Sequence, residues 1–341
     1  METLELEKAL GRVARTCYDL ESVNRLVREC PEKLIEVSEK IVDDQIEKVV
    51  NAMIQGDFRF LLLAGPSSSG KTTTANIIIK KLQKLGRRAI KVSVDDFFID
   101  LDKCQKTSDG TVDMESITKL DLPCFNRFFN EIMKNNKAFK PVFDFVSNKR
   151  KAEQELIEVG DNDAIVVEGT HALNPALLES GRYAKKVLKV YACVNSEFKL
   201  GKQLLISSRK IRLIRRMIRD VQTRGEGIEN TLKYWKVVVK GEDKYVNPFR
   251  TNADFLIDTT HIYELAVYDK FVPKLLDPIR HIDHADELLQ VFGKSGQLSK
   301  NLVPKSSLLW EFCPKMSQFR GSFWEFWGSF HFLSFSAVRF A

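Results

Sequence analysis

A short run near the front of the chain has the residue types and spacing of a loop that binds phosphate. Residues 65–72, GPSSSGKT, fit the pattern G-x-x-x-x-G-K-[ST] at every fixed position. The glycines let backbone N–H groups curl around a phosphate, and the start of the following helix adds partial positive charge. Lys71 can reach the β- and γ-phosphates, and the Thr72 hydroxyl can ligate Mg²⁺. We therefore predict a nucleotide site formed by Gly65, Pro66, Ser67, Ser68, Ser69, Gly70, Lys71, Thr72 and Thr73.

Several carboxylates follow apolar runs elsewhere in the chain. Asp95 and Asp96 come directly after the run 89–94, Glu168 lies at the end of the run 164–169, and Asp113 follows a polar stretch at 101–112. A phosphoryl-transfer enzyme needs metal ligands and a group that accepts the proton of the attacking hydroxyl. Because ligands bind at the carboxyl ends of parallel strands, these acids are candidates for both tasks.

Positive charge is concentrated between Lys199 and Arg224. This stretch holds nine basic residues and one acid, Asp220, in a chain whose formal net charge is +7. Such a cluster indicates a phosphate-rich ligand, and nucleic acid is the weaker alternative because no aromatic residue interleaves it. We expect one helix, with an apolar stripe at Ile211, Ile214, Ile218 and Val221 beside a guanidinium face at Arg209, Arg212, Arg216 and Arg219.

Five short apolar runs predict the strands that position these residues. They are 58–65, 89–94, 164–169, 186–194 and 253–260, and the first is followed by a helical pattern over 72–85 with Gly86 as its C-terminal cap. Strands that alternate with helices form βαβ units. The sequence therefore predicts an α/β fold with a mostly parallel sheet flanked by helices.

The chain divides into three segments on pattern and composition. Residues 1–57 are expected to be a helical N-terminal extension that supplies packing or oligomerisation surface, and residues 58–290 the main domain. Residues 291–341 form a tail that is rich in phenylalanine from Phe312 onward, with no clear period or cap. A partner-binding segment, a membrane-surface segment and a poorly ordered one remain alternatives for it.

Composition excludes several protein classes. The chain has 341 residues, of which 44% are hydrophobic and 29% charged, so disordered, collagen-like and fibrous chains are excluded. Six scattered cysteines without a C-x-x-C pair indicate neither a disulfide framework nor a zinc site. No apolar run reaches the roughly 18 residues of a spanning helix. A reducing, cytoplasmic setting without a membrane partner is the expectation.

Six segments, in order along the chain, together form a more specific pattern than the phosphate loop alone. They are GPSSSGKTT (65–73), VSVDDFF (92–98), VDMES (112–116), PVFDFVSNKRK (141–151), VVEGTHALNP (166–175) and RLIRRMIRDVQTRG (212–225). In them the chain closely resembles the uridine kinase family of the phosphoribulokinase/uridine kinase group. The resemblance implies a P-loop NTPase fold with an arginine-rich helical lid. It also implies a kinase that uses ATP, or another NTP, with Mg²⁺ to phosphorylate the ribose 5′-hydroxyl of a uridine- or cytidine-like nucleoside.

The resemblance also implies roles for single residues. Asp95 matches the catalytic base, and Asp113 matches the carboxylate that holds the ribose 2′- and 3′-hydroxyls. The metal set would be Thr72, Asp95 and Glu168, and the groups that stabilise the transferring phosphoryl group would be Lys71, Arg219 and Arg224. The residues expected near the nucleoside are Phe98, Phe143, Asn148 and Arg216.

Four positions depart from the family pattern. Asn148 replaces a histidine, Glu226 replaces an arginine, and Phe98 and Phe143 replace tyrosines. These changes concern the base and leave the ribose and phosphate groups in place. They motivate a second hypothesis, a kinase of another small hydroxylated metabolite such as a sugar phosphate or a pantothenate-like compound. A third is a nucleotide-binding regulator with little transfer activity. Members of this family often form homo-oligomers.

Overall fold

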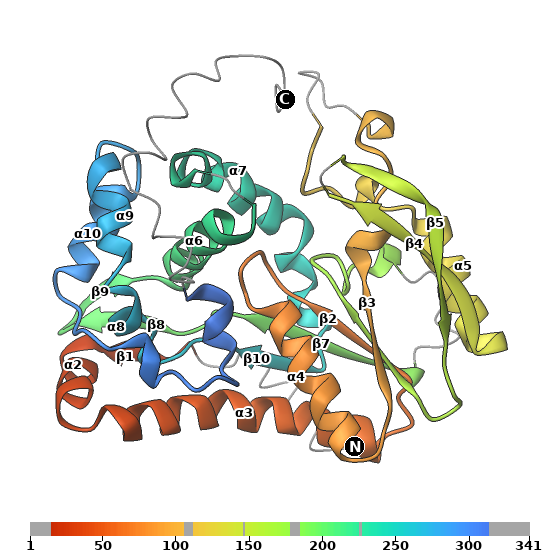
Figure 1. The fold of residues 1–341 in the computed structure, drawn as a ribbon, viewed down its shortest axis with the longest axis horizontal. Coiled ribbons are helices and arrows are strands. Elements are labelled where there is room, and N and C mark those ends of the chain that lie inside the picture. Colours follow the sequence, from red (N-terminus) through yellow and green to blue (C-terminus); the bar gives the residue numbers. More distant parts are fainter. Residues whose placement is uncertain (1–14, 106–111, 146, 178–184, 225–226, 314–341) are drawn as a thin grey trace.

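The core of the fold is a five-stranded parallel sheet (Figure 1). The computed structural model describes residues 15–105, 112–145, 147–177, 185–224 and 227–313. The strands lie in the order β10-β7-β2-β6-β3, and every neighbouring pair is parallel. All five predicted strands are confirmed, with the bounds β2 Phe60–Ala64, β3 Ala89–Ser93, β6 Ala164–Glu168, β7 Val187–Cys193 and β10 Phe255–Asp258.

Alternate side chains of β2 face two different helical layers. Leu61 and Leu63 pack with α3 (Pro31–Gln55) and α4 (Lys71–Lys84) on one face. Phe60 and Leu62 pack on the other face with α5 (Leu122–Asn135). The predicted N-terminal extension therefore contributes a covering layer of the sheet itself, because the apolar face of α3 is buried against it.

A hairpin of antiparallel strands packs against α5. It consists of β4 (Lys137–Asp144) and β5 (Lys149–Glu158). The sequence patterns did not predict it, because β5 is largely exposed and rich in charge and so lacks the apolar run of a buried strand. In Figure 1 the hairpin lies at the opposite end of the molecule from α9 and α10.

A helical region with its own apolar cluster lies at the far end of the sheet from the hairpin (Figure 1). Its helices are α2 (Leu20–Glu29), α6 (Ser208–Arg219), α7 (Ile228–Tyr245), α8 (Glu264–Tyr268), α9 (Val272–Leu276) and α10 (Ala285–Phe292). A π-helix, Asp220–Arg224, continues α6. A small sheet in the order β1-β8-β9 completes the region, with β1 Cys17–Asp19, β8 Glu197–Leu200 and β9 Gln203–Ile206.

Residues beyond the expected domain end at 290 also pack into this cluster. We define residues 304–313 as the C-terminal segment. Its 3₁₀-helix, η10 (Leu308–Phe312), buries Leu308, Leu309 and Phe312 at no more than 1% exposure. The apolar core thus extends to Cys313, past the predicted boundary, because these side chains fill space beside α6 and α4. The rest of the aromatic tail, residues 314–341, lies outside the described residues.

Candidate active site

The predicted phosphate loop joins the central strand β2 to α4. The strand order changes direction at β2, which has β6 on one side and β7 on the other, and ligands bind at such a switch point. A side chain at Gly65 would place its Cβ 2.0 Å from the carbonyl oxygen of Ala192 in β7, so only glycine fits there. Ser68 and Gly70 have left-handed backbones, with φ of 59° and 80°. The chain therefore turns sharply between strand and helix.

The interior of the loop carries polar groups suited to an anion. The hydroxyls of Ser68 and Ser69 are buried and have no hydrogen-bond partner among the residues that the structure describes. A buried hydroxyl without a partner is costly unless a ligand satisfies it. The first turn of α4 adds free N–H groups and contains no acidic residue of its own. The residues present therefore fit a bound phosphate group.

Lys71 and Glu168 form the charged floor of the site. The ammonium of Lys71 donates to the carbonyl oxygen of Pro66 at 3.0 Å, and the Thr72 hydroxyl lies 3.5 Å from Glu168 Oε2. Burial lowers the pKa of Lys71, and the charges of Glu168 and Asp95 oppose that shift. Burial likewise raises the pKa of Glu168, against the effect of Lys71. The two groups therefore act on each other electrostatically.

The structure separates the two adjacent aspartates after β3. Both lie in the 3₁₀-helix η1 (Val94–Phe97). Asp96 accepts from the buried Lys140 of β4 at 2.6 Å, which makes it a structural anchor for the hairpin. Asp95 is half-buried, and its charge acts on the pKa values of Lys71 and Glu168. The predicted base therefore lies beside the loop lysine and the predicted metal carboxylate.

Two arginines of α6 contact the phosphate loop directly, the predicted lid residue Arg219 and Arg216, which was expected near the nucleoside. Arg216 and Arg219 each donate to the hydroxyl of Ser67 at 3.1 Å. Behind them, the buried carboxylate of Asp220 accepts from both guanidinium groups, at 3.2 and 3.3 Å. The charge of Arg219 also lowers the pKa of Lys71, so the lid lies close to the loop lysine. Arg224 ends the π-helix, and its side chain lies outside the described part of the chain, as does Glu226.

The guanidinium face expected on this helix is only partly correct. Arg212 is 4% exposed and forms a two-pronged ion pair with Glu242 of α7, at 2.7 and 2.6 Å. Arg215 is fully buried and pairs with Glu264 at 2.9 Å. These two arginines do not face solvent because acids from α7 and α8 compensate them inside the core. The predicted apolar stripe is confirmed for Ile211, Ile214 and Ile218, all at most 2% exposed, whereas Val221 lies in the π-helix and is half-buried.

The Arg212–Glu242 pair also holds the backbone of the loop. Arg212 donates to the carbonyl oxygen of Ser67 at 3.0 Å, and the N–H of Ser67 donates to Glu242 at 3.1 Å. Sequence reasoning missed Glu242. A usable signal existed, since Leu232, Trp235, Val238 and Glu242 share one helix face whose other members are apolar and buried.

Aromatic side chains form a wall on the hairpin side. Phe98 meets Phe143 edge-on, with ring centroids 5.6 Å apart, and both contact the exposed Phe145. The ammonium of Lys119 lies 4.3 Å from the centroid of the Phe98 ring. Phe98 and Phe143 were predicted site residues, whereas Phe145 and Lys119 were not. The burial of Lys119 lowers its pKa, and the charges of Glu115, Asp95 and Asp113 act against that shift.

Arg150 of β5 attaches this wall to η1. Its guanidinium donates to the carbonyl oxygens of Phe97 and Phe98 and to Asp121, at 2.7 to 2.9 Å. Asn148 lies in the turn of the hairpin with a φ of 53°, and its carbonyl oxygen accepts from the N–H of Leu101. The hairpin thus carries the predicted residues Phe143 and Asn148 to the η1 side of the site.

Asp113 is held by a tyrosine that the sequence analysis did not single out. Its Oδ2 accepts from the hydroxyl of Tyr245 at 2.6 Å, and its Oδ1 accepts from the N–H of Glu115 at 3.2 Å. His171 lies beside Tyr245, with ring centroids 6.5 Å apart. Burial lowers the pKa of His171 to about 4, so the imidazole is neutral at pH 7.

Within the described residues, no three His, Cys, Asp or Glu side chains form a metal-binding cluster. A magnesium ion at this site would therefore depend on Thr72, on Glu168 and on oxygens of the nucleotide and water, which is the usual composition of such sites in kinases. Asp95, the third predicted metal residue, is close enough to influence Glu168 electrostatically.

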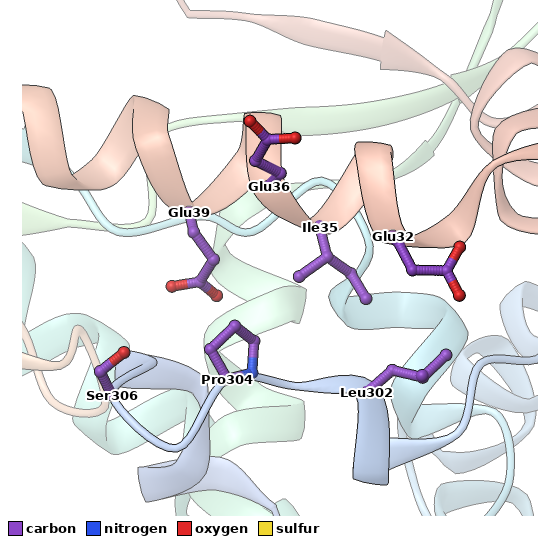
Figure 2. Close-up of a pocket in the computed structure, with 7 residues that line it drawn as sticks. All are labelled: Glu32, Ile35, Glu36, Glu39, Leu302, Pro304 and Ser306. Atoms are coloured by element: carbon purple, nitrogen blue, oxygen red, sulfur yellow. The ribbon is translucent and has the colours of Figure 1, made fainter.

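An open pocket lies away from these groups, between α3 and the C-terminal segment. Figure 2 shows Ile35 and Glu39 of α3 pointing toward Pro304 and the neighbouring Leu302. Its full lining is Glu32, Ile35, Glu36, Glu39, Leu302, Pro304 and Ser306, and none of these is a predicted site residue. No helix in the described ranges is long and apolar enough to cross a membrane.

Comparison with known proteins found relatives in sequence and in structure. The chain is 26% identical over 195 residues to a uridine kinase of Ureaplasma parvum, a match that covers 57% of this chain and 84% of the relative. It is 28% identical over 204 residues to a uridine kinase of Staphylococcus aureus, with the same coverage. A solved structure described as a possible uridine kinase from Bacillus stearothermophilus aligns over 63% of this chain and 98% of its own, with 18% identity and a TM-score of 0.43.

The match to a family model is the decisive comparison. The model described as "Phosphoribulokinase / Uridine kinase family" matches residues 60–266. This range begins at β2 and includes the phosphate loop, η1, the hairpin and the arginine lid. The protein is therefore a P-loop kinase, and it belongs to the phosphoribulokinase/uridine kinase family.

Proposed function

We propose that this kinase transfers the γ-phosphoryl group of ATP to the ribose 5′-hydroxyl of a nucleoside of the uridine or cytidine type. The observation that carries the proposal is the position of Asp95. Its charge acts on Lys71 of the phosphate loop and also on Lys119 beside the Phe98 ring. Asp95 lies in η1, which follows β3 beside the Glu168 end of β6 and is followed directly by Phe98, so it is near both the loop lysine and the aromatic wall.

The side chains divide the reaction between them. Asp95 accepts the proton of the acceptor hydroxyl while that oxygen forms its bond to the γ-phosphorus and the bond to the β-phosphate oxygen breaks. Lys71, Arg216 and Arg219 surround the loop with positive charge, which stabilises the charge on the transferring group. Mg²⁺ held near Thr72 and Glu168 would neutralise part of the phosphate charge. Catalysis of this kind depends on positioning and charge.

The acceptor side fits a flat base attached to a sugar. Asp113 can accept two hydroxyl donors, and the hydroxyl of Tyr245 fixes its orientation. Phe98 and Phe143 offer aromatic surface to a base, and Asn148 adds an amide at the hairpin turn. Asn148 and Phe98 differ from the residues usual in the resembled family, so we assign the class of nucleoside and leave the choice of base to experiment.

One observation favours a second candidate, a kinase of an anionic metabolite such as a sugar phosphate. Lys119 places a cation beside Phe98, and the charges of Asp95 and Asp113 reach it. A cation near the acceptor hydroxyl would attract a phosphate or carboxylate on the acceptor.

The first experiment measures ADP release from ATP and Mg²⁺ against a panel of acceptors. The panel contains uridine, cytidine, adenosine, guanosine, inosine, ribulose 5-phosphate and pantothenate, with the Asp95→Asn variant as the blank. Turnover with a pyrimidine nucleoside that is lost in the blank is the expected result. Turnover with an anionic acceptor alone would replace the first candidate with the second.

A further inference from the structure

The C-terminal segment forms one wall of the phosphate loop. The side chain of Leu308 packs closely against Gly70. A Cβ atom on Gly70 would lie only 2.8 to 3.2 Å from the carbons of Leu308. Leu308 is 1% exposed, and the neighbouring Ser307 donates to Glu39 of α3 at 2.6 Å. The segment lies outside residues 60–266, the range matched by the family model. The residues that complete this wall therefore lie beyond the range of the family match.

The segment also brings a carboxylate to the start of α4. The hydroxyl of Thr73 donates to Glu311, a residue 238 positions further along the chain. Thr73 follows Thr72 in the first turn of α4, and that turn has no acidic residue of its own. A helix start attracts negative charge through its free N–H groups. Glu311 therefore supplies an anion to the end of the helix at which a phosphate would also bind.

Packing alone does not require this charge. Leu308, Leu309 and Phe312 are buried, and the guanidinium of Arg215 lies 4.9 Å from the centroid of the Phe312 ring. These contacts and the Ser307–Glu39 hydrogen bond already hold the segment in place. Glu311 itself is only half-buried, and its negative charge raises the pKa of Lys71, as a smaller influence than burial. Glu311 is therefore close enough to Lys71 to interact with it electrostatically.

We propose that Glu311 tunes the donor site, where its carboxylate beside Thr73 lowers the affinity for the phosphates of the nucleotide. The inference rests on the proposed function only for the binding of ATP and not for the identity of the acceptor. Two like charges separated by several ångströms near a protein surface repel by about 1 kcal/mol or more. A negative charge that lowers the affinity for ATP also lowers the affinity for ADP, so the same charge favours product release.

The test compares ATP binding by calorimetry in the wild type and in Glu311→Gln, without any acceptor present. The variant keeps the shape of the side chain and an oxygen that accepts from Thr73, and it removes the charge. We expect the dissociation constant to fall about three- to tenfold at low salt, with a smaller difference at about 0.5 M salt because the repulsion is then screened. Unchanged or weaker binding would overturn the proposal.

Two further variants make the result specific. Glu36→Gln makes the same charge change on the exposed face of α3 and should leave ATP binding unchanged. Glu311→Ala removes the charge without requiring an amide to fit, and it replaces Glu311→Gln if thermal unfolding shows that the latter is not folded. Because binding is measured without an acceptor, failure of every acceptor in the panel would count against the proposed function and would not affect this result.

Discussion

The donor side and the acceptor side of the site are held in different ways. The phosphate loop is fixed from several directions by buried groups, including the Arg212–Glu242 pair, Leu308, and the hydroxyl of Thr259, which donates to the carbonyl oxygen of Ser69 at 2.8 Å. The aromatic wall is carried by a hairpin whose strand β5 is largely exposed, and it includes the 59% exposed Phe145. The comparison indicates that the geometry of the phosphate loop is fixed. Residues of the acceptor surface can be substituted without disturbing the loop.

Loss of the base should separate the two sides most sharply. Asp95→Asn removes the proton acceptor and leaves the loop contacts in place, so we expect kcat to fall by about 10² to 10⁴-fold. The dissociation constant for ATP, measured by calorimetry, should stay within about twofold of the wild-type value. Asp102→Asn, an exposed aspartate on the same connection, is the control. A loss of ATP binding equal to the loss of turnover would contradict this division.

Breaking the buried pair should damage the donor side and the fold together. Glu242→Ala leaves Arg212 charged and uncompensated in the core, so we expect the free energy of unfolding to fall by about 3 to 5 kcal/mol. Denaturant unfolding measures the loss. Asp243→Ala removes the neighbouring acid, whose pair with Arg209 is nearly half exposed, and should cost less than about 1 kcal/mol. Equal losses in the two variants would show that the pair does not brace the loop.

Acid should weaken the acceptor side through His171. Its pKa is lowered from 6.5 to about 4 in the folded chain because of burial, so the unfolded chain binds more protons between these values. Stability should therefore fall as the pH drops from 6.5 to 4, by about 3 kcal/mol in total, and change no further through this group below pH 4. Unfolding measured across this window should show a shallower slope for His171→Asn. If the stability of the wild type and of the variant changed equally with pH, His171 would not be the cause of the acid effect.

The smallest effect is expected on the aromatic wall. Phe98→Ala should raise the KM for the acceptor about five- to tenfold, which corresponds to about 1 kcal/mol of lost aromatic contact, and leave the KM for ATP unchanged. Phe139→Ala, at an exposed position of the same hairpin, should change neither value. Steady-state kinetics with both substrates varied distinguish the cases. An equal rise in the KM for ATP would contradict the prediction, because it would show that the aromatic wall also affects binding at the donor side.

Local patterns were sufficient to predict the sheet and the phosphate loop. The five strands are short and mostly apolar, with β2 and β6 fully buried, and the loop has a fixed spacing, so each can be recognised without its neighbours. The hairpin could not be predicted in this way, because the charged side chains of β5 lie in solvent. Arg150 and the Lys140–Asp96 pair attach the hairpin to the rest of the domain. Both depend on partners about 30 to 50 residues away in the sequence.

The arginine helix shows the same limit. Its apolar stripe was predicted from spacing, but spacing does not reveal whether an arginine meets solvent, phosphate or an acid from another helix. Arg212 and Arg216 lie four residues apart, yet one pairs with Glu242 inside the core and the other donates to Ser67 of the loop. The contribution of Glu311 was beyond prediction for the same reason, since its partner lies 238 positions earlier. The roles of Asp95 and Asp113 in catalysis stay predictions.

The wall that Leu308 builds against Gly70 also has a consequence for the order in which a new chain matures. The ribosome makes the loop 238 residues before Glu311, which at about 5 to 20 residues per second is an interval of about 10 to 50 s. During that interval β2 and α4 can form, but the loop between them lacks the side chain that closes over its last glycine. Each newly made chain therefore acquires its finished nucleotide site only after Leu308 has been made.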